Sequence, residues 1–373
     1  MVKLKEFIKG TLKVVLSYLK VSYWIIEPNK KQHQPIAFLF GFSNWKKSFM
    51  IHYLSDEEVK LIPSSVHMNF LSFLMKKYEK KAFYIWGCDE KRDDNIIEFA
   101  KSEKIPFFRV EDGFIRSKNL GVMKAQPLSL SIDSKGIYFD ATSPSDLEEI
   151  LNHYDFQADV KLLKRSKDGI ELMKNLGVSK YNHVLPKDIE QIYGEKTRKR
   201  VLVIGQVEDD ASIKKGCERP ITNNELVRLA KMENPDADII YKPHPDVLYG
   251  KRKLYSNPDE VKEIAYVMEE PIRLNDALQT IDHVYTITSL AGFEALIRHI
   301  PVTTIGAPFY SGWGLTDDRQ PVSRRKRKLT IEEVFAGAYL LYPKYVDVQT
   351  GEPITMEAAM KQISLEMLEE RKG

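Results

Sequence analysis

Residues 200–212 read RVLVIGQVEDDAS and decide the fold class. The first five residues form a mostly apolar run of strand length, which leads directly into Gly205 and a polar turn. Glycine at this junction lets the backbone approach a ligand closely. Gln206, Asp209 and Ser212 then offer hydrogen bonds where the next helix is expected to begin. This order is typical of α/β sheets, whose ligands bind beyond the carboxyl ends of the strands.

On both sides of this segment, short apolar runs alternate with helical patterns, which favours parallel sheets of the α/β kind. The alternation restarts near residue 195 after a polar stretch, so two α/β halves with a ligand cleft between them are predicted. The predicted organisation is an amphipathic helix over 1–30, a first domain over 31–195, a second over 196–345 and a helix over 346–373. The expected strands are 36–40, 60–62, 82–86, 107–110, 128–132, 137–139, 200–204, 238–241, 283–286 and 302–305.

Composition excludes several classes of protein. A chain of 373 residues has the length of about two domains. Hydrophobic residues at 43% and charged residues at 29% exclude disordered, collagen-like and simple coiled-coil chains. A net charge of +3 argues against a dedicated nucleic-acid-binding protein. Cys88 and Cys217 are too few for a disulfide framework and sit in no metal-ligand cluster, so a reducing compartment is expected. No apolar run reaches about 18 residues, so no membrane-spanning helix is expected.

A first polar cluster follows the strand expected over 107–110. Glu111 and Asp112 precede Gly113, and the turn should present at least one of these acids to the cleft. Such a carboxylate can act as a base or as a nucleophile, with Arg116 close enough in sequence to hold a negative group. A turn that merely needs an acidic cap would look similar.

Two further clusters follow strands in the second half. Lys242 precedes His244, and prolines on both sides of the histidine restrict its backbone. A histidine held beside a lysine suits a phosphate group, and a buried structural histidine is the alternative. Thr288 and Ser289 stand where a helix is expected to begin, which makes an anion site unless they only cap the helix.

Two other features allow a functional and a structural interpretation. Trp313 lies in the loop 306–315, GAPFYSGWGL, and loops of this kind often close over ligands, although ordinary packing of the indole is equally compatible. The successive acids at 208–210 would suit Mg²⁺, but adjacent side chains cannot all converge, so no metal is expected. An acid facing a histidine, a serine and helix amides across a cleft is what a two-domain nucleotide-sugar transferase needs.

Several of these motifs resemble the capsule polysaccharide biosynthesis family, in particular its KpsC-type β-Kdo transferases. The resemblance covers roughly residues 36–348. It rests on EDGFIRS (111–117), DATSPSDL (140–147), QVEDDASI (206–213), KPHPD (242–246), GFEAL (292–296) and PFYSGWGLT (308–316). The acid-acid-Gly and His-Pro motifs are also similar to those of bacterial sialyltransferases.

The resemblance implies a GT-B-like fold of two Rossmann-like domains with the active site between them. It implies a retaining glycosyltransferase that takes a 2-keto sugar acid, Kdo or a related nonulosonic acid such as pseudaminic acid, from its CMP donor. The acceptor would be a bacterial surface glycan or glycolipid in capsule or lipopolysaccharide biosynthesis, with no cofactor. Typical members carry two such modules in tandem and this sequence shows one, which favours addition of a single sugar.

The residues and the resemblance together assign roles to individual positions. Asp112 is the candidate catalytic carboxylate, with Glu111 beside it. The expected substrate contacts are Arg116, Ser117 and Trp313. The expected donor-binding residues are Gln206, Asp209, Lys242, His244, Thr288, Ser289, Gly292 and Glu294. A rival of another class is a non-catalytic sugar-binding or assembly component of a capsule export complex, which needs no acid at 111–112. A transferase that uses UDP sugars is disfavoured only by the resemblance.

The first 26 residues differ from the rest in charge. Residues 1–20 carry five lysines against one glutamate, and an aromatic end with Tyr23 and Trp24 follows. This pattern is typical of a helix in a membrane interface, so contact with the inner face of the bacterial inner membrane is expected for an otherwise cytoplasmic protein. A helix packed on its own protein is the alternative. At 100° per residue, Leu4, Phe7, Ile8, Leu12, Val15 and Leu19 fall on one side, and Lys5, Lys9, Lys13 and Lys20 on the other.

A second basic cluster, RRKRK at 324–328, has three interpretations. It would suit a solvated loop, a phosphate-facing patch or a second contact with acidic lipid.

Overall fold

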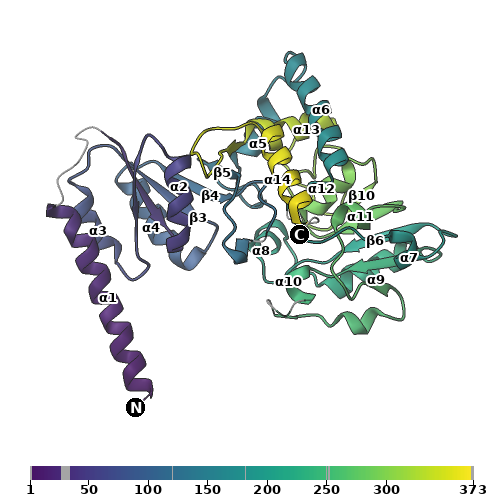
Figure 1. Cartoon of the computed structure of the whole chain (residues 1–373), viewed down its shortest axis with the longest axis horizontal. Helices are drawn as coiled ribbons and strands as arrows, with labels where there is room; N and C mark the ends of the chain where they lie inside the picture. The colour runs from purple at the N-terminus through teal and green to yellow at the C-terminus, as the bar shows by residue number, and fades with distance from the viewer. Residues whose placement is uncertain are drawn as a thin grey trace.

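The computed structural model describes residues 2–26, 34–119, 121–180, 182–248, 250 and 253–370. Two six-stranded sheets form two lobes, with helices packed around each (Figure 1). The predicted α/β class and GT-B-like architecture are confirmed. The strands are β1 Ile36–Phe40, β2 Glu58–Leu61, β3 Lys81–Trp86, β4 Phe107–Asp112, β5 Ser129–Asp133, β6 Arg200–Ile204, β7 Asp238–Lys242, β8 Tyr266–Val267, β9 His283–Thr286, β10 Val302–Thr304, β11 Asp317–Asp318 and β12 Pro343–Tyr345.

Short helices join most of the strands. Several begin at side-chain caps, such as the Thr222–Glu225 capping box of α9, because a helix start leaves backbone N–H groups without partners. The helices are α1 Val2–Ile26, α2 Lys47–Tyr53, α3 Met68–Met75, α4 Glu90–Ser102, α5 Asp146–His153, α6 Val160–Leu176, α7 Ile189–Tyr193, α8 Ala211–Gly216, α9 Asn223–Glu233, α10 Pro245–Leu248, α11 Leu274–Ala277, α12 Leu290–Leu296, α13 Ile331–Phe335 and α14 Met356–Glu370. The 3₁₀ turns are η1 Asn44–Lys46, η2 Gly121–Met123 and η3 Pro258–Val261, and η4 Ala336–Leu341 is π-helical.

The first sheet has the strand order β12-β5-β4-β3-β1-β2. Strands β2, β1, β3 and β4 are parallel, whereas β5 and β12 are antiparallel to their neighbours. All five residues of β1 are buried, as expected of a central strand covered on both faces. The second sheet, β11-β10-β9-β6-β7-β8, is parallel throughout.

The chain returns to the first sheet near its C-terminal end. Residues 343–345 form β12, which pairs with β5, so the predicted second domain over 196–345 extends too far. The strand has three residues and begins with proline, which is too short for a recognisable pattern. The predicted strand over 137–139 is also wrong, because this segment turns and Tyr138 packs on Phe114, with ring centroids 4.8 Å apart.

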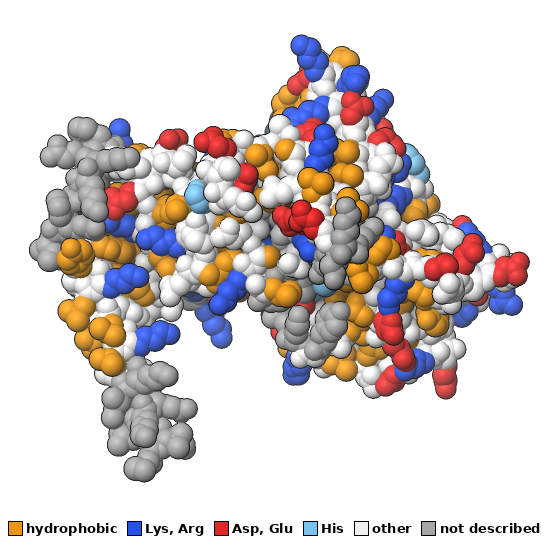
Figure 2. Space-filling view, in the orientation of Figure 1, with side chains coloured by type: hydrophobic (Ala, Val, Ile, Leu, Met, Phe, Trp, Pro, Cys, Tyr) orange, Lys and Arg blue, Asp and Glu red, His pale blue; other side chains and the backbone are white. Residues whose placement is uncertain are grey.

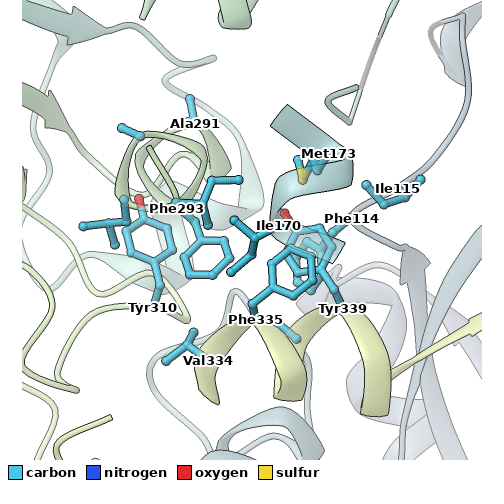
Figure 3. Close-up of a cluster of buried hydrophobic side chains, with 14 of the residues drawn as sticks. Phe114, Ile115, Ile170, Met173, Ala291, Phe293, Tyr310, Val334, Phe335 and Tyr339 are labelled. Atoms are coloured by element: carbon cyan, nitrogen blue, oxygen red, sulfur yellow. The ribbon is translucent and has the colours of Figure 1, made fainter. Parts of the chain in front are cut away.

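One core cluster joins both halves of the chain. Phe114 follows the first sheet, Phe293 lies on α12 of the second half, and Tyr339 lies on the segment that returns to the first sheet. All three are almost completely buried. Figure 3 shows Phe114, Phe293 and Tyr339 in the same cluster as Phe335 and Tyr310. The two lobes are therefore held together by a shared hydrophobic core.

The first helix packs on its own protein along one face and leaves another face exposed. Its last turns pack on the first lobe through Val21 and Trp24, and the Tyr18 ring lies 5.0 Å from that of Phe70. The face around Leu12 and Leu19, which lies roughly opposite at 100° per residue, is 57% and 61% exposed at these two leucines. Figure 1 shows α1 projecting away from the lobe, with its C-terminal end nearest to it. The side chains of residues 1–9 lie outside the described part.

None of the helices within the described residues is long and apolar enough to cross a lipid bilayer.

The basic cluster at 324–328 binds α5. The Glu148 carboxylate accepts from Arg324 Nε at 2.6 Å and from Arg325 Nε at 3.2 Å. Arg327 donates to backbone carbonyls at the end of α5, among them that of Tyr154 at 2.8 Å. The three arginines therefore bind within the protein, which leaves Lys326 and Lys328 as the exposed cations of this cluster.

We predict that Glu148→Ala lowers the free energy of unfolding by about 3 kcal/mol, because it leaves the buried Arg325 guanidinium without its carboxylate. Urea denaturation measures this loss. The matched control is Asp168→Ala, which breaks the exposed Lys164–Asp168 pair and should change stability by less than about 1 kcal/mol. Equal stability of the two variants would show that Glu148 does not hold the lobes together.

Candidate functional site

A cleft of about 700 Å³ lies between the two lobes and is lined from both of them. The first lobe contributes Glu111 and Asp112 at the end of β4, and the second contributes residues that follow β6, β7 and β9. Because ligands of parallel sheets bind beyond the carboxyl ends of the strands, this is the expected position for a substrate.

Asp112 presents one carboxylate oxygen that has no partner. Its Oδ2 accepts a hydrogen bond from Arg116 Nε at 2.7 Å, and its side chain is 14% exposed. Its Oδ1 is buried and accepts no hydrogen bond from any described residue. A buried polar atom without a partner is costly and needs an explanation, and at the wall of a cleft a ligand or a chemical role supplies one. Asp112 Oδ1 is therefore the candidate reactive atom.

Arg116 holds Asp112 in place. The guanidinium is 1% exposed, and its Nη1 donates to Ser117 Oγ at 2.6 Å while Nη2 donates to the Ala125 carbonyl at 2.9 Å. Arg116 also lines the cleft, and these bonds make it a positioning residue for Asp112, while its predicted contact with substrate stays a prediction. Ser117 donates to the Asn119 carbonyl and does not line the cleft, so its predicted substrate contact is wrong.

Glu111 is a titratable group next to the reactive carboxylate. Burial and, after it, the Asp112 charge raise the pKa of Glu111 to about 7, against the opposing effect of Lys180, the Asp112 N–H and Lys46. Its Oε1 accepts from the Asp112 backbone N–H at 2.9 Å. A carboxyl group with a pKa near neutrality can accept or donate a proton at physiological pH.

In the second lobe, Gln206 and Thr288 form a reciprocal pair. Gln206 Nε2 donates to Thr288 Oγ1 at 3.1 Å, and the Thr288 backbone N–H donates to Gln206 Oε1 at 2.7 Å. The pair orients the start of α12, where the Ser289 hydroxyl accepts from the Ala291 N–H. Gln206, Thr288 and Ser289 all line the cleft.

His244 also lines the cleft, and its imidazole is oriented by its own turn. The Asp246 backbone N–H donates to His244 Nδ1 at 3.1 Å, so a neutral ring carries its proton on Nε2 and can donate it. The prolines on both sides of His244 fix the turn, as expected from the sequence.

Two predicted donor contacts in the second lobe do not line the cleft. Lys242 shares a face of β7 with the core residue Ile240, and burial lowers the pKa of its amine to about 8. Asp209 Oδ2 accepts from the Tyr255 hydroxyl at 3.3 Å. Asp210 and Ser212 of the same turn do line the cleft, and Asp210 Oδ1 accepts from the Ser212 N–H and hydroxyl.

Three other predicted contacts belong to the core. A Cβ on Gly292 would lie 2.2 Å from Tyr310 Oη, so glycine is required there for close packing. Glu294 is 1% exposed, accepts from Ser179 Oγ at 2.8 Å, and has its pKa raised by burial. Trp313 is fully buried and donates from Nε1 to the Phe309 carbonyl at 2.8 Å. The predicted donor contacts of Gly292 and Glu294 and the predicted substrate contact of Trp313 are wrong.

The sequence motifs missed one wall of the cleft. Trp45, Lys46 and Trp86 line it from the first lobe, and Lys180 lines it from the connection between the lobes. Trp86 stands at the carboxyl end of β3, so the strand-end rule could have found it. Lys46 lies in η1, where no pattern marks it.

Among the described residues, no group of three or more His, Cys, Asp or Glu side chains is arranged to hold a metal ion.

The comparisons with known proteins agree with this arrangement. The family model for the capsule polysaccharide biosynthesis protein matches residues 81–186 and 179–347. The chain belongs to the capsule polysaccharide biosynthesis family. Both matched segments contribute to the cleft, since the first contains Asp112 and the second contains Ser289.

Two relatives in this family carry names linked to surface polysaccharides. The chain is 43% identical over 335 residues to the lipopolysaccharide-processing protein LpsZ of Rhizobium meliloti, which covers 90% of this chain and 76% of LpsZ. It is 37% identical over 360 residues to the capsule polysaccharide modification protein LipA of Neisseria meningitidis serogroup A. That match covers 94% of this chain and 48% of LipA, so the chain spans about half of LipA.

Two solved structures are similar over most of the chain. The Thermosulfurimonas dismutans KpsC β-Kdo 2,4 transferase aligns with a TM-score of 0.76 and 32% identity, covering 89% of this chain and 98% of that one. The β-Kdo 2,7 transferase of the same KpsC aligns with a TM-score of 0.69 and 35% identity, covering 89% and 99%.

Proposed function

We propose that the chain is a retaining glycosyltransferase that moves a 2-keto sugar acid, Kdo or a related nonulosonic acid, from its CMP donor to a glycan or glycolipid acceptor. Its place would be capsule or lipopolysaccharide biosynthesis, as the names of LpsZ and LipA suggest for those relatives. The similarity to two KpsC β-Kdo transferases supports the reaction class. The observation that carries the proposal is that Asp112 lines the cleft and keeps one carboxylate oxygen, Oδ1, without a partner among the described residues.

The second lobe supplies groups for the CMP phosphate. The His244 ring and the Thr288 and Ser289 hydroxyls line the cleft from the second lobe and can donate hydrogen bonds to phosphate oxygens. Gln206 acts by positioning Thr288. Because these groups can meet the phosphate directly, we propose that the enzyme needs no metal cofactor.

The reaction proceeds by two displacements at the anomeric carbon. In the first, Asp112 Oδ1 forms a bond to this carbon while the bond to the CMP phosphate oxygen breaks, and CMP leaves with the electron pair. In the second, the acceptor hydroxyl oxygen bonds to the same carbon and the bond to Asp112 breaks. Two inversions give net retention. Arg116 keeps Oδ2 occupied, so that Oδ1 faces the sugar.

Glu111 serves the second step as the base that takes the proton of the acceptor hydroxyl. Its pKa of about 7 places it near the pH at which a base is most effective.

The rival function is a non-catalytic sugar-binding component of an export complex. In such a protein Asp112 Oδ1 would accept a sugar hydroxyl instead of attacking the anomeric carbon. Turnover-dependent release of CMP from a CMP sugar distinguishes the enzyme from this rival.

We predict that Asp112→Asn reduces CMP release from the CMP-sugar by about 10³-fold or more, because the amide cannot act as the nucleophile. CMP binding, measured by calorimetry, should persist. The control is Asp94→Asn, which changes an exposed residue on α4.

Mass spectrometry of the products from a panel of CMP sugars identifies the donor. The same assay in EDTA checks that no metal is needed. Full activity of Asp112→Asn would exclude the mechanism.

We predict that kcat/KM for the acceptor rises about tenfold per pH unit below pH 7 and levels off just above pH 7. The sign follows from the role, since Glu111 must be ionised to accept a proton and its pKa is raised to about 7. Glu111→Gln should have a lower kcat/KM that no longer rises with pH, whereas the kcat/KM of Glu111→Asp should still rise with pH. An unchanged pH profile in Glu111→Gln would assign the base elsewhere.

We also propose that α1 rests on the inner face of the bacterial inner membrane. The exposed stripe of Leu12, Leu16 and Leu19 supplies apolar contact, and Lys13 and Lys20 are exposed beside it. Figure 2 shows hydrophobic and basic side chains together on this projecting helix. An apolar stripe flanked by lysines suits an anionic lipid surface.

We predict that Leu12→Glu/Leu16→Glu/Leu19→Glu lowers binding to anionic vesicles about tenfold or more in flotation. The face that packs on the first lobe remains intact in this variant. The matched control changes three exposed apolar residues elsewhere, Val160, Leu185 and Leu365, to glutamate. Equal flotation of the two variants would mean that α1 does not contact the membrane.

A further inference from the structure

The first-lobe wall of the cleft contains an aromatic and basic cluster that the steps above do not use. Trp45 and Lys46 come from η1 after β1, and Trp86 ends β3. All three are half-buried and line the cleft. They stand on the same lobe as Glu111 and Asp112, opposite the groups assigned to the CMP phosphate.

The Lys46 ammonium lies over an indole face and lacks a carboxylate partner. Its Nζ is 3.0 Å from the centroid of the Trp86 ring and 5.9 Å from that of Trp45. No carboxylate within the described residues lies at ion-pair distance from it, and Glu111 and Asp112 act on it only at longer range. The indole covers one side of the ammonium, so its N–H donors on the other side can bind an anion.

The chemistry of this wall fits an anionic sugar. Indole faces pack against the C–H groups of a pyranose ring, and an ammonium group pairs with a carboxylate or phosphate. Burial lowers the pKa of Lys46 to about 8, so the group carries its charge at neutral pH. If the donor occupies the second lobe, the acceptor must approach Asp112 along the first-lobe wall.

We propose that Lys46, over Trp86 and beside Trp45, binds a negatively charged group of the acceptor sugar and so selects anionic acceptors. This inference rests on the proposed transferase function and names the site that holds the second substrate. The shared chemistry is a carboxylate or phosphate on the sugar that carries the reacting hydroxyl.

The test compares three variants of the full chain. Lys46→Met removes the charge, Lys46→Arg keeps it, and Lys47→Met is a matched control on the next, exposed lysine. Two reactions are measured with each: CMP release to water without acceptor, and transfer to a sugar acid, its methyl ester and a sugar phosphate. Transfer to the sugar phosphate tells which anion the site prefers.

Loss of one charged hydrogen bond should raise the acceptor KM of Lys46→Met about tenfold or more for the anionic acceptors, and leave CMP release to water within about twofold. The preference for acid over ester should disappear in Lys46→Met and persist in Lys46→Arg and Lys47→Met. If Lys46→Met does not fold, the test rests on Lys46→Arg, whose transfer to the sugar acid is compared with its transfer to the methyl ester.

Two outcomes would overturn the proposal. One is equal use of acid, phosphate and ester by the unmodified chain. The other is a Lys46→Met variant that loses CMP release to water while its acceptor KM stays unchanged, which would assign Lys46 to the donor. If no CMP sugar reacts with the unmodified chain, the transferase function fails. The acceptor site is then judged by calorimetric binding of the sugar acid and its ester to the unmodified chain and to Lys46→Met, and equal binding would exclude it.

Discussion

The aromatic packing around Phe114 is the constraint on which the rest of the structure depends. Its ring centroid lies 4.8 Å from that of Phe309 and 5.2 Å from that of Tyr339, so one residue touches the second lobe and the returning segment together. Phe114 follows the catalytic candidate Asp112 by two residues. Because protein interiors are close-packed and transmit displacements, this contact fixes the acid relative to the opposite wall, where Ser289 caps the helix that carries Phe293.

Two buried acids show how the same chemistry serves structure and function. Glu148 is almost fully buried, and both of its oxygens are paired with arginines, as expected of a carboxylate that stabilises the contact between lobes. Asp112 has one oxygen held by Arg116 and the other without a donor among the described residues. A carboxylate oxygen without a hydrogen-bond donor lowers the stability of the protein, but the same oxygen is able to react.

Strands were predictable where the chain forms short runs rich in apolar or β-branched residues. The runs at 36–40, 200–204 and 283–286 coincide with β1, β6 and β9, because central strands covered on both faces bury most of their side chains. The short strand β12 was not predictable, since three residues that begin with proline show no period. Its position depends on antiparallel pairing with β5, more than 200 residues earlier in the chain.

The sequence by itself determined which turns line the cleft, because the polar residues at the ends of β4, β6, β7 and β9 interrupt apolar runs. Only the tertiary structure decided which side chains of those turns face the cleft. Glu294 and Trp313 stand in the same motifs as cleft residues but point into the shared core. Lys46 lines the cleft with no motif to mark it. The direction of a side chain depends on which distant segments pack behind it, and local sequence does not contain that information.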